Sequence, residues 1–134
     1  MPPKRPSAKG QRVLLAKDAS ITGSLRFHAE LGFIGWWSDA DSTATWKVRD
    51  LRPGDYDVYI DYASPGYGGR YSLGFGKNRL QAEAIDTGGW RAYRKKYVGR
   101  VTIESRAVDV VIKAVEIVGT ALMDVGAVTL VPAK

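Results

Sequence analysis

The chain has 134 residues, of which 45% are apolar and 25% are charged. This length fits one domain, and the apolar fraction is too high for a disordered chain. The sequence has no cysteine and a single histidine, His28, which excludes disulfides, thiolate zinc sites and cysteine nucleophiles. No apolar run approaches the roughly 18 residues of a membrane span, and no apolar segment follows Met1, so the sequence predicts neither a membrane anchor nor a signal peptide.

The net charge of +6 is concentrated at the beginning of the chain. Residues 1–17 contain five Lys and Arg residues and no acidic residue, whereas the rest of the chain holds 15 basic and 14 acidic residues. We therefore interpret residues 1–11 as a basic flexible leader or linker and residues 12–134 as a single, nearly neutral domain.

From Val13 onward, apolar and polar residues alternate repeatedly with a period of two, as in the segment 55–63. This period is typical of half-buried β-strands, and turn residues such as Arg52-Pro53-Gly54-Asp55 separate the segments. No segment keeps an amphipathic helical pattern for three turns. The predicted strands lie near 13–17, 23–28, 33–37, 43–49, 55–63, 70–76, 79–85, 96–103, 107–114 and 122–131. Short antiparallel strands at this spacing predict an all-β sandwich of two sheets.

Tryptophan residues give the strongest indication of function. Trp36 and Trp37 are consecutive at a strand end, so alternation directs only one of them into the core, and the pattern alone does not decide which. Trp90 follows Gly88-Gly89 in a predicted loop, where an exposed ring indicates a binding surface. Plain core packing is the ordinary role for the remaining Trp46 and for two tyrosines, Tyr56 and Tyr62.

Carbohydrate binding is a natural use of such rings. One face of a pyranose ring carries C–H groups that stack on an aromatic ring, and its hydroxyls need nearby polar side chains.

Several short motifs, in a shared order from Val13 to Pro132, resemble carbohydrate-binding modules of families 6 and 35, and most closely the family-6-like domains attached to bacterial fucosidases and sulfatases. The motifs are Leu15-Ala16-Lys17-Asp18-Ala19, Ile34-Gly35-Trp36-Trp37, Asp41 to Trp46, Pro53-Gly54-Asp55-Tyr56-Asp57-Val58, Tyr62-Ala63, Thr87-Gly88-Gly89-Trp90 and Ala121 to Leu130. The resemblance implies a jelly-roll sandwich of the galactose-binding-like type without catalytic activity.

The resemblance also implies a sugar site in the loops at one end of the sandwich. Trp36 and Trp90 match the two rings that clamp a sugar, and Asp124 matches an asparagine that binds sugar hydroxyls. An aspartate accepts but does not donate hydrogen bonds, so the hydroxyl pattern that it selects differs. Three neighbours complete the candidate binding residues, namely Trp37, Arg91 and Tyr93.

Modules of this kind commonly hold a structural calcium ion, for which the matching positions here are Lys17 and Gly126. A lysine offers no oxygen ligand, so we expect no calcium at that place and no other cofactor, although Asp18, Asp109 and Asp124 leave room for another arrangement. The resemblance further implies a polysaccharide or oligosaccharide partner, neutral or anionic, an attached glycoside hydrolase or sulfatase, and an extracellular or periplasmic location.

Other classes of function are less well supported. Catalysis would use paired carboxylates such as Asp39/Asp41 or Asp55/Asp57, but these lie in turns, where aspartate has an ordinary structural role. His28 alternates with Arg26 and Glu30 on a predicted outward face and has no evident nucleophile nearby. Nucleic-acid binding would use the leader and one basic cluster, Arg91, Arg94, Lys95 and Lys96, with Tyr93 and Tyr97 between them. A structural or protein-contact module is the remaining alternative.

Overall fold

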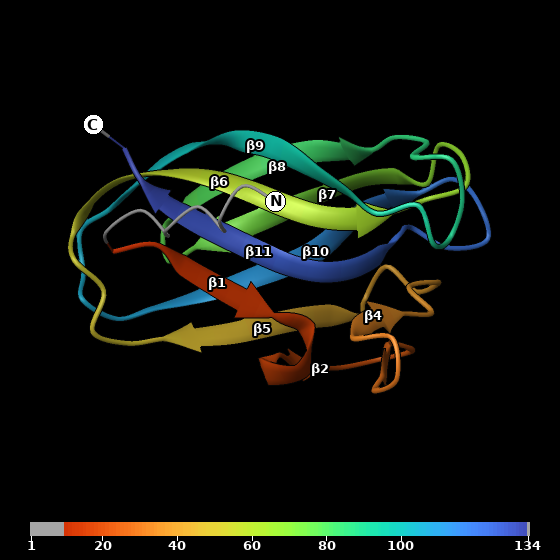
Figure 1. The fold of residues 1–134 in the computed structure, drawn as a ribbon, viewed down its shortest axis with the longest axis horizontal. Coiled ribbons are helices and arrows are strands. Elements are labelled where there is room, and N and C mark those ends of the chain that lie inside the picture. The colour runs from red at the N-terminus through yellow and green to blue at the C-terminus, as the bar shows by residue number, and fades with distance from the viewer. Residues whose placement is uncertain (1–9, 134) are drawn as a thin grey trace, which may run out of the picture.

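The computed structural model describes residues 10–133. Within them the chain forms eleven strands and one short 3-10 helix, and all strand pairings are antiparallel (Figure 1). In chain order the elements are β1 (Arg12–Leu15), η1 (Ala16–Asp18), β2 (Ser20–Ile21), β3 (Arg26–His28), β4 (Phe33–Gly35), β5 (Thr43–Val48), β6 (Gly54–Ala63), β7 (Gly69–Phe75), β8 (Asn78–Ala84), β9 (Arg94–Ile103), β10 (Val108–Ile117) and β11 (Asp124–Pro132).

The strands form two sheets that pack face to face. The first has the order β3-β4-β11-β6-β9, and β1 pairs with the same edge of β11 as β4 does. The second has the order β2-β5-β10-β7-β8. The predicted all-β, two-sheet antiparallel sandwich is therefore confirmed.

The predicted strands correspond to the observed ones with small differences at their ends. The structure adds the two-residue strand β2, which is too short to show a period, and η1 replaces the end of the strand expected at 13–17. Strand β9 begins at Arg94, two residues earlier than expected. Among residues 10–133 no helix is long and apolar enough to cross a membrane. Most of the predicted leader lies outside the described residues.

Alternating side chains from both sheets fill the core. Tyr56, Val58, Ile60 and Tyr62 of β6 are buried, while the residues between them face outward. Trp46 of β5 is also buried, and its indole Nε1 donates a hydrogen bond of 2.7 Å to the carbonyl oxygen of Leu15. The core role predicted for Trp46, Tyr56 and Tyr62 matches their burial.

We expect Trp46→Ala to lower the free energy of unfolding by about 3–5 kcal/mol, because it leaves a cavity between the sheets. Urea unfolding measures this change. Trp90→Ala is the matched control, because its half-exposed ring lies in a loop. Equal unfolding midpoints for the two variants would contradict the assignment of Trp46 to the core.

Candidate functional site

The two consecutive tryptophans at the end of β4 point to opposite sides of the chain. Trp36 is 60% exposed, whereas Trp37 is fully buried. Trp36 adopts a φ of 65°, which is unfavourable for a bulky residue by about 1–3 kcal/mol. This left-handed residue ends the strand and turns the next side chain into the core. Trp37 was predicted as a binding residue, and the structure corrects this because its ring packs between the sheets.

Hydrogen bonds hold the backbone of this turn in place. The carbonyl oxygen of Trp36 accepts a bond of 2.8 Å from Ser24 Oγ and one of 2.9 Å from the backbone N–H of Ser38. The N–H of Leu122 donates to the carbonyl oxygen of Trp37 at 2.8 Å, which joins the turn to the loop before β11. The exposed position of Trp36 is therefore fixed from both sides.

Trp90 lies in the loop between β8 and β9, which is anchored through Thr87. This buried threonine accepts a hydrogen bond from the N–H of Ser64 at 2.9 Å through its hydroxyl oxygen, and its own N–H donates to the Ser64 carbonyl. Gly88 and Gly89 follow with φ values of 112° and 151°, which few side chains tolerate. The anchored turn presents Trp90 with 38% of its surface exposed.

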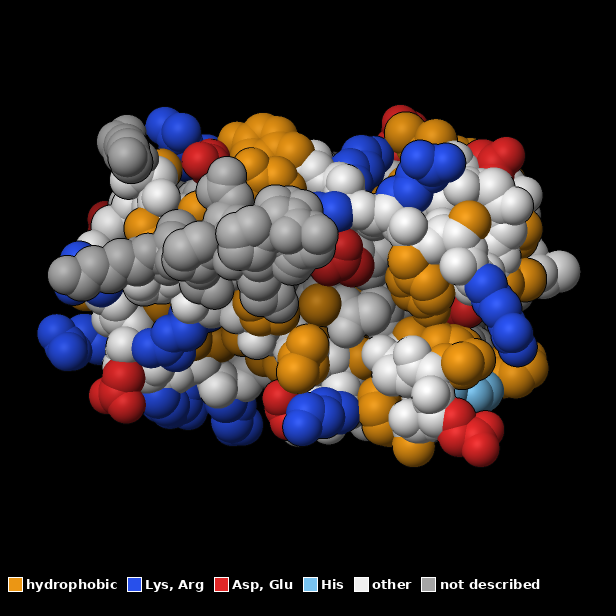
Figure 2. Space-filling view, in the orientation of Figure 1, with side chains coloured by type: hydrophobic (Ala, Val, Ile, Leu, Met, Phe, Trp, Pro, Cys, Tyr) orange, Lys and Arg blue, Asp and Glu red, His pale blue; other side chains and the backbone are white. Residues whose placement is uncertain are grey.

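A cavity of about 340 Å³ opens at this end of the sandwich, and we call it the Trp36–Trp90 cavity. Its lining comes from four separate segments, namely His28, Phe33, Trp36, Ser38, Trp90, Thr120, Ala121 and Asp124. The connecting loops lie at the right-hand end in Figure 1, and Figure 2 shows hydrophobic side chains gathered with the single histidine at that end. Three predicted site residues, Trp36, Trp90 and Asp124, thus come together in one cavity.

Two other predicted residues lie outside its lining. Arg91 is exposed, and Tyr93 is 37% exposed, with its ring 6.1 Å from the ring of Phe33. Burial raises the pKa of the Tyr93 hydroxyl, and the nearby charge of Asp124 raises it further. Tyr93 therefore supports the site as a neutral neighbour of Asp124.

His28 and Phe33 are site residues that the sequence did not reveal. They face each other across the β3–β4 hairpin, and their rings stack with centroids 4.5 Å apart. The His28 ring also lies 5.8 Å from that of Trp36. The signal that could have found them is the hairpin register, since Gly32 closes a four-residue connection that sets His28 opposite Phe33.

Asp124 opens β11 at the base of the cavity. It pairs with Ala63 of β6, and the next residue, Val125, pairs with Ile34 of β4. Asp124 is only 7% exposed, and no hydrogen bond or ion pair joins its side chain to another residue within 10–133. Burial of the charged form raises the pKa of its carboxyl from 3.8 to about 7.

Solved structures with the same arrangement of strands include carbohydrate-binding modules. A family 35 module from Clostridium thermocellum gives a TM-score of 0.74 at 14% identity, over 92% of this chain and 98% of that one. A module of Cellvibrio mixtus lichenase 5A, in complex with cellotriose, gives a TM-score of 0.73 at 17% sequence identity, over 92% of this chain and 98% of that one. The GH26-CBM35 β-(1,4)-mannanase of Podospora anserina gives a TM-score of 0.72 at 16% sequence identity, over 93% of this chain. The chain has the fold of these modules.

The likeness is one of fold. No family model and no curated protein matches the sequence. The chain spans 28% of the length of the Podospora anserina mannanase and nearly the full length of the two separate modules. Because one fold serves many functions, the function has to be argued from the cavity.

The residues at the expected calcium positions do not fit the ion. Lys17 is exposed in η1 and carries no oxygen ligand. Gly126 carries no side chain, and the Tyr93 ring lies 3.7 Å from where its Cβ would stand, so a ring occupies the adjacent space. Within residues 10–133 no group of three or more His, Asp or Glu side chains is placed to hold a metal ion.

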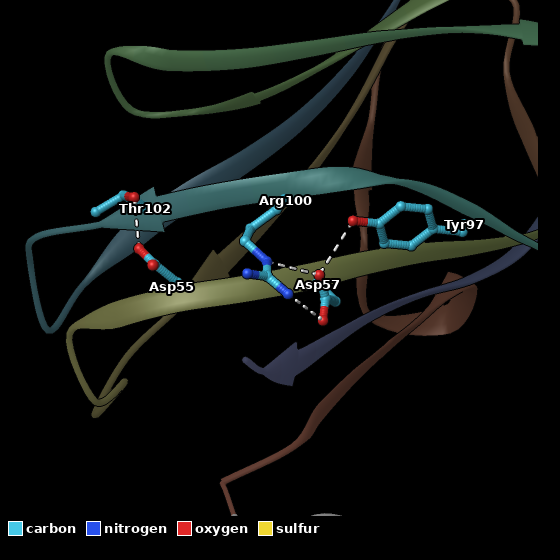
Figure 3. Close-up of polar contacts among 5 residues, drawn as sticks. All are labelled: Asp55, Asp57, Tyr97, Arg100 and Thr102. Atoms are coloured by element: carbon cyan, nitrogen blue, oxygen red, sulfur yellow. Dashed lines mark hydrogen bonds and ion pairs between the residues drawn. The ribbon is translucent and has the colours of Figure 1, made fainter. Parts of the chain in front are cut away.

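The aspartate pairs considered for catalysis have structural partners. Asp57 binds Arg100 through both carboxylate oxygens, at 3.0 and 3.4 Å, and accepts the Tyr97 hydroxyl at 3.1 Å (Figure 3). Hydrogen bonding to Arg100 lowers the pKa of Asp57, which keeps it ionised. Asp55 accepts the Thr102 hydroxyl at 2.6 Å, and Asp39 accepts the N–H of Asp41 at 2.8 Å in a turn. These contacts favour structural roles for both pairs.

The basic cluster considered for nucleic-acid binding is divided between two faces of β9. Arg94 donates to the carbonyl oxygen of Thr87, and Lys96 donates to that of Glu83 on β8. Lys95 faces the other way, opposite an aspartate of β6. These side chains therefore do not form one cationic surface.

A larger and shallower depression of about 680 Å³ lies at the opposite end of the sandwich, beside the turns after β7 and β9. Charged and turn residues such as Lys77, Glu104 and Asp109 line much of it, and its one aromatic residue, Phe75, is buried. Its lining offers no exposed aromatic ring, so the smaller cavity is the candidate site.

We expect Gly35→Ala to lower the free energy of unfolding by about 1–3 kcal/mol, because its Cβ would stand 2.8 Å from both Asp124 Oδ1 and a ring carbon of Phe33. Gly66→Ala is the control, since its Cβ would meet nothing within 4 Å. Urea unfolding of both variants tests this. Equal stabilities would show that the base of the cavity is loosely packed.

Because of Asp124, the free energy of unfolding should decrease as the pH rises from about 4 to about 7. Its carboxyl has a pKa of about 7 when folded and an ordinary value of 3.8, so the folded chain holds an extra proton in this window. Stability is therefore greatest at the acid end and falls with a slope that approaches about 1.4 kcal/mol per pH unit.

The measurement is the difference in unfolding free energy between Asp124→Asn and the wild type from pH 4 to 8. The other carboxylates cancel in this difference. The unfolding free energy of the variant minus that of the wild type should increase up to about pH 7 and then level off. A difference that stays constant with pH would contradict the raised pKa of Asp124.

Proposed function

We propose that this chain is a non-catalytic carbohydrate-binding module and that the Trp36–Trp90 cavity is its glycan site. The observation that carries the proposal is the meeting of two exposed tryptophans, from separate loops, with one buried carboxyl in a single cavity. A few rings that supply contact area and a few polar groups that set orientation are the usual composition of a small-ligand site.

The cavity suits a sugar ring both in size and in chemistry. Its volume of about 340 Å³ is at the lower end of the roughly 300–1,000 Å³ of small-molecule sites, which favours one or two sugar units. Trp36 and Trp90 offer faces for the C–H groups of a pyranose. Asp124, Ser38 and Thr120 offer oxygen atoms to its hydroxyls.

The position of the cavity supports the same proposal. The bound cellotriose of the Cellvibrio mixtus module shows that one protein with this fold holds an oligosaccharide. Here, the strongly paired strands form the scaffold, and the aromatic side chains lie on the connections at one end, where binding residues usually lie.

A neutral glycan fits better than an anionic one. An anion in the cavity would meet the Asp124 carboxyl, and the nearest predicted cation, Arg91, lies outside the lining. We further propose that the module directs an attached glycoside hydrolase or sulfatase to polysaccharide outside the cytoplasm, in the extracellular space or periplasm. The resemblance of the sequence motifs supports this part.

We expect Trp90→Ala and Trp36→Ala each to weaken glycan binding about ten- to hundredfold, because each removes one stacking ring worth roughly 1–3 kcal/mol. Titration calorimetry with a panel of neutral and amino oligosaccharides that includes cellotriose measures the change. Tyr97→Ala is the matched control, since this ring is 50% exposed on the outer face of β9.

Loss of affinity in both tryptophan variants, with full affinity in the tyrosine control, would support the proposal. Equal affinities in all of them would reject the cavity as the glycan site. A panel that shows no binding at all would favour the alternative of a protein-contact module, which uses the exposed rings against another protein.

A further inference from the structure

The Asp124 carboxyl is the least ordinary group in the Trp36–Trp90 cavity. The carboxyl of a residue that is only 7% exposed normally binds a cation or several N–H donors, because burial of an unpaired charge is costly. Within residues 10–133 it has no such partner. Its position is nonetheless built, because Gly35 leaves room for Oδ1 at a distance that a Cβ would block.

The groups around this carboxyl do not neutralise it. Strands β3 and β4 contribute His28 and Phe33, and the loop between β8 and β9 contributes Trp90. The Tyr93 hydroxyl near Asp124 is un-ionised, and the remaining lining residues, Trp36, Ser38, Thr120 and Ala121, carry no charge. No Lys or Arg of residues 10–133 lines the cavity, and the ring of His28 is stacked on Phe33. The carboxyl therefore faces an aromatic cavity without a resident cation.

Aromatic faces and a carboxylate attract the same kind of ligand group. The π faces of Trp36, Trp90 and Phe33 are negative and favour a cation within about 6 Å. A carboxylate forms its strongest hydrogen bonds with a charged N–H donor. An ammonium group on the ligand would interact favourably with both the aromatic faces and the carboxylate. A neutral hydroxyl would interact more weakly with each of them.

We infer that the Trp36–Trp90 cavity selects a sugar with a free amino group, such as a glucosamine unit whose ammonium binds Asp124. This inference rests on the proposed glycan site and adds the class of sugar. The ring of the sugar stacks on a tryptophan while its ammonium donates to the carboxylate, so the buried acid acquires its missing partner. N-acetylation of the amine removes the charge and adds bulk at the same atom, so the acetylated sugar is rejected.

The inference also predicts a movement of protons. Near neutral pH, part of the free protein carries a protonated Asp124, since burial raises the pKa of this carboxyl to about 7. An ammonium ligand stabilises the ionised form, so Asp124 releases a proton on binding. Acidification protonates Asp124 and so removes the carboxylate that pairs with the ammonium, and affinity for the amino sugar therefore falls as the pH decreases.

Three β-1,4-linked trisaccharides test the inference, since they differ only at C2: the glucosamine trimer, the N-acetylglucosamine trimer and cellotriose. Titration calorimetry at pH 6.5, in buffers of different ionisation enthalpy, measures both affinity and proton release. For the wild type we expect the glucosamine trimer to bind at least about tenfold more tightly than cellotriose and to release protons.

Asp124→Asn should remove the preference for the glucosamine trimer and bring its affinity within about twofold of that of cellotriose. The variant should also lose the proton release that Asp124 contributes on binding. Asp41→Asn is the matched control, because it removes the same charge from an exposed turn. It should leave the preference unchanged. Thermal melts show whether each variant is folded. The comparison of the three trimers on the wild-type protein tests the inference even if a variant fails to fold.

The outcomes separate this inference from the proposed function. Cellotriose that binds as tightly as the glucosamine trimer, and that depends on Trp90, would overturn the inference and leave the glycan site standing. A preference for the glucosamine trimer that survives Asp124→Asn would also overturn it. If Trp90→Ala leaves the binding of every trimer unchanged, both the inference and the glycan site are wrong.

Discussion

A largely buried aspartate that has no partner side chain within residues 10–133 costs stability while it is ionised, and such an aspartate, Asp124, lines the cavity at the end of this sandwich. Asp124 occupies its place because β11 pairs with β4 on one side and with β6 on the other. Gly35, on the neighbouring strand, has no Cβ to displace the carboxyl. The register of the central strand therefore fixes the polar base of the cavity, and the loops supply the rings around it.

The position of the rings depends on a second constraint, which acts on the backbone. A left-handed φ at Trp36 lets two consecutive large side chains serve opposite purposes, one exposed at the cavity and one buried between the sheets. The strained residue is held by bonds from Ser24 and Ser38 to its carbonyl oxygen. Unfavourable dihedral angles persist where the surrounding structure imposes them, and such sites are often functional.

The sequence predicts all strands but the two-residue β2, because the period of two in the longer segments is a local signal. It also predicts Trp90 as an exposed ring, since a glycine pair next to a tryptophan is local as well. The choice between Trp36 and Trp37 depends on one dihedral angle, and the contribution of His28 depends on the register of a hairpin. The burial of Asp124 depends on strands far apart in the chain, so no local pattern could reveal it.

The division of the molecule between scaffold and site has an energetic consequence. Residues such as Trp46 stabilise the folded chain in every state, whereas Asp124 destabilises it as long as its carboxyl is ionised and unpartnered. A ligand that supplies the missing partner binds only the folded chain, so its binding energy includes the relief of this cost. The same buried carboxyl that lowers the stability of the free protein thereby raises its selectivity. Functional sites in proteins commonly retain such unfavourable groups for this reason.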